Sequence, residues 1–273
     1  MSELAPIEIV HPQHPRGPFR AAIFDFDGTL SLLRRNWQDV MIPMMVDILS
    51  ETGTTESREQ LLLHVEDFVM RLNGKQTIFQ MMRLAEEVTS RGGVAMDPLA
   101  YKHQYHELLW HEVGERVESV RCREVRADDV TVPGSRAFLT VLKQAGLDLY
   151  LASGTDLKYV RDELSVLGLE GFFGDHVYGA LDDYRKFSKA MVIEQIIRDT
   201  GLAGAELIGV GDGFVEIEEV KKVGGLAIGV ASNENTRSGI NAWKRNRLIQ
   251  AGADIIVGDY VQLKDLKSLL ALC

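Results

Sequence analysis

The chain has 273 residues, of which 40 are acidic and 30 basic, so its formal net charge is −10. Hydrophobic residues make up 45% of the chain and charged residues 26%, a balance that excludes extensive disorder. The acidic excess argues against binding to nucleic acid or to an anionic membrane, because both partners require a basic surface.

Three features of the sequence indicate a cytoplasmic protein. Two cysteines, Cys122 and Cys273, are too few for a disulfide framework, which fits a reducing compartment. No segment approaches the roughly 18 consecutive apolar residues of a membrane helix. The first twenty residues contain four prolines and lack the apolar core of a signal peptide.

The chain opens with a proline-spaced segment. Prolines at that density interrupt both helices and strands, so residues 1–19 are predicted to form an extended arm. The apolar run that follows ends at Asp25, which predicts a buried strand leading into a loop.

Residues 32–125 have a different pattern, since apolar residues recur there at helical spacing. Glycines separate the apolar stretches, as is typical of helix ends. Helices are predicted within residues 36–51, 57–74, 77–93 and 97–120. The block contains no convincing strand.

Strands and helices alternate after residue 130. The predicted helices cover residues 133–146, 156–169, 188–202, 214–225, 236–252 and 261–273, and the predicted strands cover residues 147–155, 176–181, 206–213, 225–232 and 253–259. This alternation predicts an α/β fold of the Rossmann-like type, a parallel sheet with helices on both faces. The first strand must join the same sheet, so the all-helical block is an insertion. The predicted organisation is an arm (1–19), an α/β core (20–31 and 126–273) and an inserted helical domain (32–125).

In such a sheet the functional groups gather at the carboxyl ends of the strands. Asp25 and Asp27 follow the first strand and point to the same side, and two carboxylates so close together require a cation or a shared proton. The second core strand ends at Ser153 and Gly154, whose hydroxyl and backbone N–H groups suit an anion.

Further strand ends add carboxylates and lysines. The predicted strand at 206–213 ends at Asp212 and Gly213, and Glu216 follows it. Together with the first pair, these two carboxylates provide oxygen ligands for a hard divalent cation such as Mg²⁺. Lys186 lies just before the predicted helix at 188–202 and Lys189 lies at its start, and either can reach an anion above the strand ends. The carboxyl ends of the strands in this sheet are therefore followed, in chain order, by an acidic pair, a hydroxyl, a lysine and a second acidic motif.

These residues resemble the four motifs of the haloacid dehalogenase superfamily. The motifs are Asp25-Phe26-Asp27-Gly28-Thr29, Ser153, a lysine at 189 or 186, and Gly211-Asp212 followed by Glu216. The resemblance extends from about residue 20 to the end of the chain. It implies that the helical insertion is the cap that this family places after its first strand.

The resemblance also implies roles for the residues. Asp25 would attack phosphorus and form an aspartyl-phosphate, and Asp27 would act as general acid and then as general base. Mg²⁺ would be held by Asp25, by the backbone carbonyl of Asp27 and by Asp212. The phosphoryl oxygens would be bound by residues after the first and second core strands and by the lysine, namely Thr29, Ser153, Gly154 and Lys189 or Lys186.

Two departures from the family pattern leave alternatives open. Glu216 stands where a second aspartate is common, so it is either a metal ligand or a residue that supports the ligands. Lys189 fits the spacing of one subgroup and is preferred, whereas Lys186 is nearer a second pattern but lacks its proline. At the entry to the cap, Arg34 and Arg35 are candidate substrate contacts, although solvated arginines at a hinge are the preferred interpretation.

The predicted activity is Mg²⁺-dependent hydrolysis of a small phosphomonoester, a sugar phosphate or a phosphoglycolate-like acid. A phosphomutase of the β-phosphoglucomutase type is the second hypothesis, and a non-catalytic protein that binds a phosphorylated ligand is the third. A monomer or a homodimer is expected. The basic cluster at residues 244–247 is interpreted as the exposed face of a helix.

Overall fold

The computed structural model describes residues 7–272. The first six residues of the predicted arm, and Cys273, lie outside the described residues. The chain divides into two compact units: unit 1 contains the described residues up to Arg35 and those from Ser119 onward, and unit 2 spans Asn36–Glu118. The insertion predicted from the sequence spans residues 32–125, a few residues more at each end than unit 2.

Unit 1 is built on one sheet. Its strands in the described part of the chain are β1 (Ile7–Ile9), β2 (Ala21–Phe24), β3 (Asp148–Asp156), β4 (Val177–Ala180), β5 (Leu207–Gly211), β6 (Leu226–Val230) and β7 (Ile255–Val257). Their order across the sheet is β1-β7-β6-β5-β2-β3-β4. The six strands from β2 to β7 run parallel, and β1 pairs antiparallel with β7 at the edge. The mostly parallel α/β fold predicted from the sequence is confirmed.

Residues 1–19 are predicted to form an extended arm, but the structure contains a strand, β1, within this segment. Residues Ile7–Ile9 lie between Pro6 and Pro12 and contain no proline, so they can pair with the edge of the sheet, and the Glu8 carboxylate binds Arg245 at 2.6 Å. Prolines interrupt regular structure only in the segment that follows β1, which contains no helix or strand until β2.

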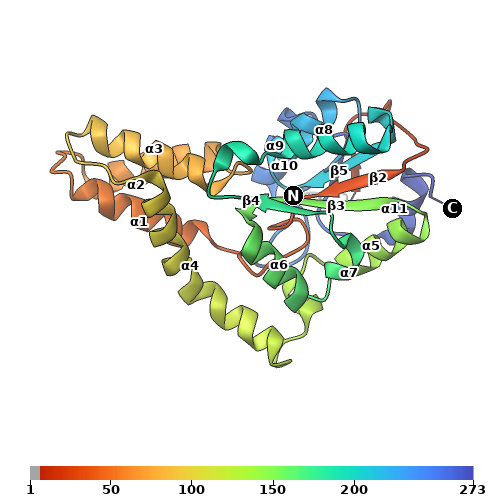
Figure 1. Ribbon diagram of the computed structural model, residues 1–273, viewed down its shortest axis with the longest axis horizontal. Coiled ribbons are helices and arrows are strands. Elements are labelled where there is room, and N and C mark those ends of the chain that lie inside the picture. Colours follow the sequence, from red (N-terminus) through yellow and green to blue (C-terminus); the bar gives the residue numbers. More distant parts are fainter. Residues whose placement is uncertain (1–6, 273) are drawn as a thin grey trace. The chain divides into compact units, whose positions relative to one another are not determined.

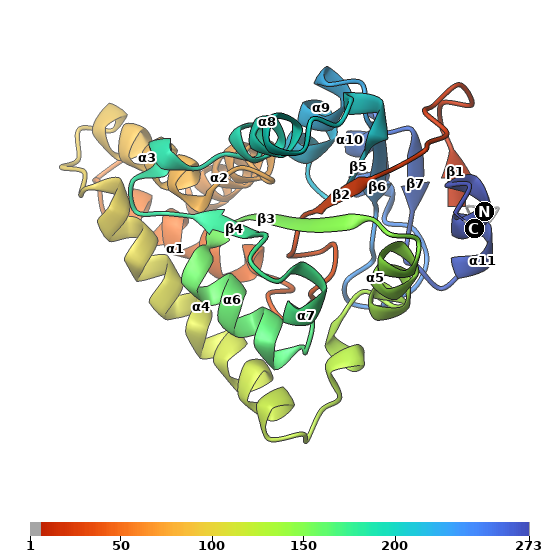
Figure 2. The same ribbon diagram turned by 45° about the vertical axis from the view of Figure 1, so that its right-hand side comes forward.

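Helices cover both faces of the sheet (Figures 1 and 2). One face carries α8 (Lys189–Thr200), α9 (Phe214–Lys222) and α10 (Ala242–Gln250), and the other carries α5 (Ser135–Gln144), α6 (Leu157–Val166), α7 (Glu170–Phe173) and α11 (Leu263–Leu269). Short 3₁₀ turns lie at Ala127–Val130, Tyr184–Lys186 and Gly204–Glu206. Because both faces are covered, the central strands are apolar along their whole length, as parallel strands require.

Strand β2 shows how this burial orients the residues after it. All four of its side chains are buried, and Ile23 belongs to the hydrophobic core beneath α8 and α9. Phe24 points to the opposite face, where its ring meets those of Phe138 and Phe173. The alternation continues past the strand, so Asp25 is on the α8 side and Phe26 is buried again.

Unit 2 is helical, as predicted. It contains α1 (Gln38–Ser50), α2 (Arg58–Arg71), α3 (Thr77–Ser90) and most of α4 (Pro98–Arg121), which continues into unit 1. A capping box at Ser57 and Gln60 fixes the start of α2. Buried side chains on α1, α2 and α3 include Met45, Leu49, Val65, Phe68, Met81 and Leu84. Within the described residues, no helix combines the length and the apolar character needed to cross a membrane.

Candidate active site

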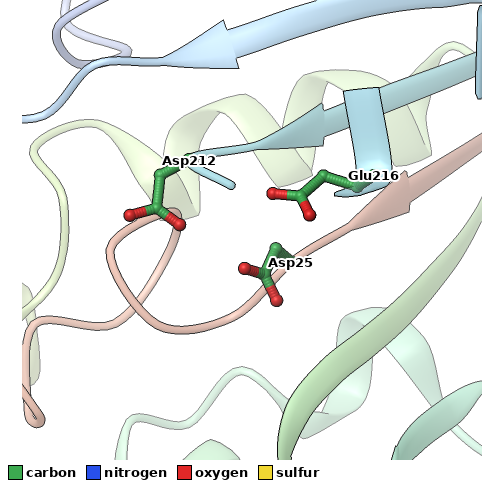
Figure 3. Close-up of side chains that lie close together, drawn as sticks. All are labelled: Asp25, Asp212 and Glu216. Atoms are coloured by element: carbon green, nitrogen blue, oxygen red, sulfur yellow. The ribbon is translucent and has the colours of Figure 1, made fainter. Parts of the chain in front are cut away.

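Three acidic side chains meet at the carboxyl ends of β2 and β5. Asp25 follows β2, Asp212 follows β5, and Glu216 lies in the first turn of α9. One carboxylate oxygen from each lies within 4.8 Å of the other two, and Figure 3 shows the three groups facing one another. The structure therefore brings together residues that are 191 positions apart at most, as the parallel sheet predicts.

Lys189 binds two of these carboxylates. It is the first residue of α8, and its Nζ atom lies 3.0 Å from Asp25 Oδ1 and 2.7 Å from Glu216 Oε2. All three side chains are buried. Burial lowers the pKa of Lys189, but the two carboxylates outweigh it, so its pKa is raised and the ammonium stays charged. Burial raises the pKa of Asp25 well above its ordinary range, against the opposing effect of Lys189.

Both carboxylate oxygens of Glu216 already have protein partners. Oε2 accepts from Lys189, and Oε1 accepts from the backbone N–H of Gly213 at 2.6 Å. Glycine at position 211 makes this possible, because a Cβ there would lie 2.1 Å from Glu216 Oε1. Of the two alternatives that the sequence leaves open, this geometry favours Glu216 as the residue that holds Lys189.

Asp212 has its own buried lysine. Lys244 Nζ, from α10, donates to Asp212 Oδ2 at 2.7 Å and to Glu234 Oε1 at 2.6 Å. Burial lowers the pKa of Lys244, but these carboxylates outweigh it, and the pKa is raised. The interpretation of Lys244 as part of an exposed basic cluster is wrong. The side chain is 8% exposed because α10 turns it, together with Leu248, toward the sheet.

Asp27 lies beside a second group of polar side chains. Its Oδ2 accepts from the Thr155 hydroxyl at 2.8 Å, and its Oδ1 lies 4.0 Å from Arg34 Nε. Arg34 in turn donates to the fully buried Glu163 at 2.6 and 2.9 Å. Burial raises the pKa of Asp27 to about 7, against the opposing effect of Arg34. A carboxyl with this pKa can both give up and take up a proton near neutral pH.

The predicted phosphate-binding hydroxyls lie on β3 and after β2. Ser153 Oγ accepts from the backbone N–H of Thr155 at 3.0 Å, so its own proton can be donated to an anion. Gly154 is half-buried next to it. Thr29 is fully buried, and within the described chain its hydroxyl has no hydrogen-bond partner. Their roles remain predictions.

The structure distinguishes between the two candidate lysines and corrects the interpretation of one of the two arginines. Lys186 is 72% exposed at its side chain and pairs with Asp183 at 3.7 Å, so the lysine that reaches Asp25 is Lys189. Arg34 is buried and bound to Glu163, which corrects the interpretation of a solvated arginine. Arg35, the next residue, is half-buried, and its role as a substrate contact stays a prediction.

The donor set fits a hard divalent cation. Asp25 and Asp212 each use one carboxylate oxygen to bind a lysine. Among the residues that the structure describes, no donor binds the other oxygen of either group, so one oxygen of each is available as a ligand. Carboxylate and carbonyl oxygens are the ligands that Mg²⁺ prefers.

A separate pocket of about 610 Å³ lies elsewhere in unit 1. Its lining residues come from the segments 120–127 and 162–168 and include Arg121, Arg123 and Asp162. It contains none of the residues predicted for the site.

Comparisons with known proteins agree with the fold and the motifs. Residues 19–224 match the family model of haloacid dehalogenase-like hydrolases. No curated protein sequence matches the chain. Similar solved structures include a predicted phosphoglycolate phosphatase from Haemophilus somnus 129PT, with 18% identity, a TM-score of 0.58, and coverage of 91% of this chain and 98% of that one. Another is β-phosphoglucomutase from Clostridium difficile, with 15% identity, a TM-score of 0.58, and coverage of 93% and 97%.

At these identities the structural likeness shows a shared fold. The family match covers more than half of the chain and includes Asp25, Ser153, Lys189 and Asp212. The resemblance stated from the motifs is confirmed, and the chain belongs to the haloacid dehalogenase-like hydrolases.

Proposed function

We propose that the chain is a Mg²⁺-dependent phosphomonoester hydrolase that acts on a small phosphorylated metabolite through an aspartyl-phosphate on Asp25. One observation carries the proposal: Asp25 is buried, one of its carboxylate oxygens is bound by Lys189, and one of its oxygens lies within 4.8 Å of a carboxylate oxygen of Asp212. This arrangement supports a nucleophile whose negative charge would be offset by Lys189 and by a cation bound between Asp25 and Asp212.

In the first half-reaction an Asp25 oxygen forms a bond to phosphorus, and the ester P–O bond breaks with its electron pair on the leaving oxygen. Asp27 donates its proton to that oxygen, which leaves as an alcohol. The pKa of about 7 supports this role, because a carboxyl with an ordinary pKa would be ionised at neutral pH.

In the second half-reaction a water molecule attacks phosphorus. Asp27, now a carboxylate, accepts a proton from that water, and the bond between phosphorus and the Asp25 oxygen breaks. The products are inorganic phosphate and free Asp25. The hydrogen bond from Thr155 to Asp27 keeps this carboxylate oriented through both halves.

We propose that Asp25, the backbone carbonyl of Asp27 and Asp212 hold Mg²⁺, with Glu216 as a support for Lys189. Bound there, the cation would neutralise the repulsion between the Asp25 carboxylate and the phosphoryl group. Ser153 and Lys189 would donate hydrogen bonds to the phosphoryl oxygens. The backbone N–H of Gly154 and the hydroxyl of Thr29 would do the same.

The substrate class is a sugar phosphate or a phosphoglycolate-like acid, in line with the activities named for the similar structures. A phosphomutase remains the second candidate, because one of these neighbours is a phosphoglucomutase. The two activities differ in the fate of the phosphoryl group on Asp25, which goes either to water or to a second hydroxyl of the sugar.

The test is phosphate release from a panel of phosphorylated metabolites with Mg²⁺ present. Asp25→Asn is expected to abolish release, and Asp199→Asn, at an exposed aspartate in the last turn of α8, to leave it unchanged. Accumulation of a sugar phosphate isomer instead of phosphate would select the phosphomutase. An Asp25→Asn variant with a near-normal rate would exclude both activities.

A further inference from the structure

Lys244 is a buried lysine whose three N–H groups all have acceptors. Its Nζ atom lies 2.7 Å from Asp212 Oδ2, 2.6 Å from Glu234 Oε1 and 3.3 Å from Ser232 Oγ. An ammonium group has three protons, so none is left for a phosphoryl oxygen. Lys244 therefore differs from Lys189, and its place in the site needs another explanation.

The contacts of Lys244 join three loops at the carboxyl end of the sheet. Asp212 follows β5, and Ser232 and Glu234 follow β6. The Ser232 hydroxyl donates to the Gly28 carbonyl at 2.7 Å and so reaches the loop after β2. A single ammonium group, directly and through Ser232, thus holds the loop after β5, which carries Asp212, against the loop after β2, which carries Asp25.

The charges around Lys244 are unequal. One buried cation faces two carboxylates, Asp212 and Glu234, whose side chains are 13% and 16% exposed. Two carboxylates held so close to each other repel strongly when no cation lies between them. Ser232, Glu234 and Lys244 all lie beyond residue 224, where the family match ends.

We propose that Lys244 acts as the built-in counter-cation of the metal site. It balances Asp212 and Glu234 when no metal is bound, and it occupies Asp212 Oδ2 while the other oxygen of Asp212 is left for the metal. The inference rests on the proposed Mg²⁺ site. It deepens that proposal by assigning a role to a residue that contacts neither the substrate nor the metal.

The arrangement has an electrostatic consequence. The Lys244 ammonium and a bound Mg²⁺ would both be positively charged and would bind the two oxygens of the same Asp212 carboxylate, so they would repel each other. Lys244 therefore weakens metal binding, while it stabilises the metal-free protein. Glu234 has the opposite effect, because it offsets the charge of Lys244. Substitutions at these two positions should therefore change the Mg²⁺ affinity in opposite directions.

The test measures Mg²⁺ binding without substrate, by calorimetric titration and by thermal unfolding with and without Mg²⁺. Lys244→Met is expected to lower the melting temperature of the metal-free protein, to tighten Mg²⁺ binding by about tenfold, and to increase the Mg²⁺-induced rise in melting temperature. Glu234→Gln is expected to weaken Mg²⁺ binding. The matched control is Lys221→Met, which removes a lysine bound to Asp254 at 2.9 Å outside the site and should leave Mg²⁺ affinity unchanged.

Opposite changes in the two variants support the counter-cation role. Unchanged or weaker binding in Lys244→Met overturns it, since a purely structural lysine would only lower stability. If Lys244→Met does not fold, the Glu234→Gln variant decides, and unchanged or tighter binding there overturns the role. A wild-type protein that does not bind Mg²⁺ refutes the proposed metal site and this inference with it, whereas wild-type binding with two unaffected variants refutes this inference alone.

Discussion

Gly28 and Asp212 lie so close together that no side chain fits between them. Gly28 has a φ of +74°, and a Cβ built on it would lie 2.2 Å from Asp212 Oδ2. The loop after β2 therefore approaches the loop after β5 through bare backbone. Glycine at this position is required twice, by its left-handed conformation and by the adjacent carboxylate.

Gly28→Ala is expected to displace Asp212 and to reduce both Mg²⁺ affinity and phosphatase activity by tenfold or more. The matched control is Gly53→Ala, where φ is +77° but nothing lies within 4 Å of the added Cβ. Both variants carry the same backbone strain, about 1–2 kcal/mol, so a comparison of unfolding curves separates strain from the clash. Equal activity in the two variants would show that the contact with Asp212 is unimportant.

The choice between the two candidate lysines gives a second prediction. Lys189 binds Asp25, whereas Lys186 is exposed and pairs only weakly with Asp183. Lys189→Met is expected to lower kcat/KM by at least about a thousandfold, since it removes a buried charge at the nucleophile and leaves Asp25 and Glu216 uncompensated. Lys186→Met should retain the wild-type value. Comparable losses in both variants would contradict the assignment.

The fold and most of the candidate site could be predicted because each depends on local patterns. The run at residues 21–24 is buried on both faces of the sheet and is therefore apolar throughout. Side chains alternate between the two faces along this strand, so the direction of the Asp25 side chain could be predicted. Strand ends in a parallel sheet meet at one edge, so Asp25, Ser153 and Asp212 could be grouped without knowing any distance.

Other features depended on tertiary structure that the sequence does not express locally. Lys244 lies among basic residues on a helix, and only the docking of α10 turns it toward Asp212. Glu163 has the pattern of a surface residue in α6, yet it is fully buried against Arg34, 129 positions earlier. Strand β1 was missed because three residues carry too little periodicity to distinguish an edge strand from an arm.

The pair formed by Arg34 and Glu163 predicts the pH dependence of the activity. Asp27 must be protonated to act as the acid, so kcat/KM should fall as the pH rises through the pKa of Asp27, which burial raises to about 7. Arg34 lowers this pKa and Glu163 raises it. Arg34→Gln should therefore move the alkaline limb to higher pH, and Glu163→Gln should move it to lower pH.

The measurement is kcat/KM against pH at saturating Mg²⁺ for the two variants and the wild type. Arg35→Gln serves as the control at the neighbouring arginine and should leave the limb in place. Shifts of both variants in the same direction would show that the limb does not belong to Asp27.

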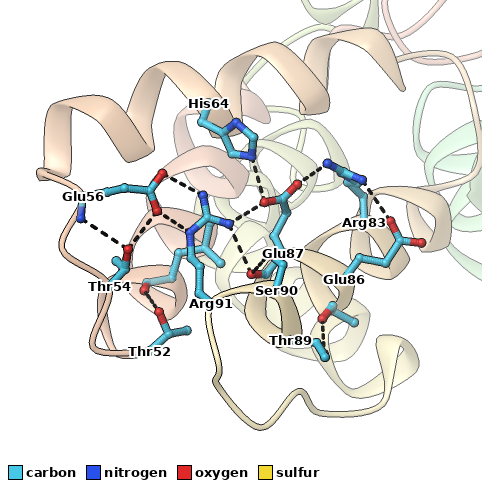
Figure 4. A network of polar contacts seen from close by, with 12 residues as sticks. Thr52, Thr54, Glu56, His64, Arg83, Glu86, Glu87, Thr89, Ser90 and Arg91 are labelled. Atoms are coloured by element: carbon cyan, nitrogen blue, oxygen red, sulfur yellow. Dashed lines mark hydrogen bonds and ion pairs between the residues drawn. The ribbon is translucent and has the colours of Figure 1, made fainter.

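A network of ion pairs in unit 2 predicts how stability depends on pH (Figure 4). Glu87 on α3 is buried and accepts from Arg91 and Arg83, and His64 Nε2 lies 2.8 Å from it. Burial raises the pKa of Glu87, but the hydrogen bonds from Arg91 and His64 outweigh it, so its pKa lies below the ordinary value. A carboxyl with a depressed pKa stabilises the fold above its unfolded pKa of about 4.3, and this stabilisation is lost as the pH falls through the folded value.

Glu87→Gln is expected to lower the stability of the protein at pH 7 by about 1.5–3 kcal/mol, the range for hydrogen bonds to charged groups. It should also flatten the decline in melting temperature between about pH 5 and pH 3, because the residue that titrates there is gone. Glu86→Gln is the matched control, since Glu86 is 67% exposed at its side chain and pairs with Arg83 at 3.1 Å. Such a surface pair contributes at most about 1 kcal/mol. Equal pH profiles for the two variants would place the acid sensitivity of the protein outside this network.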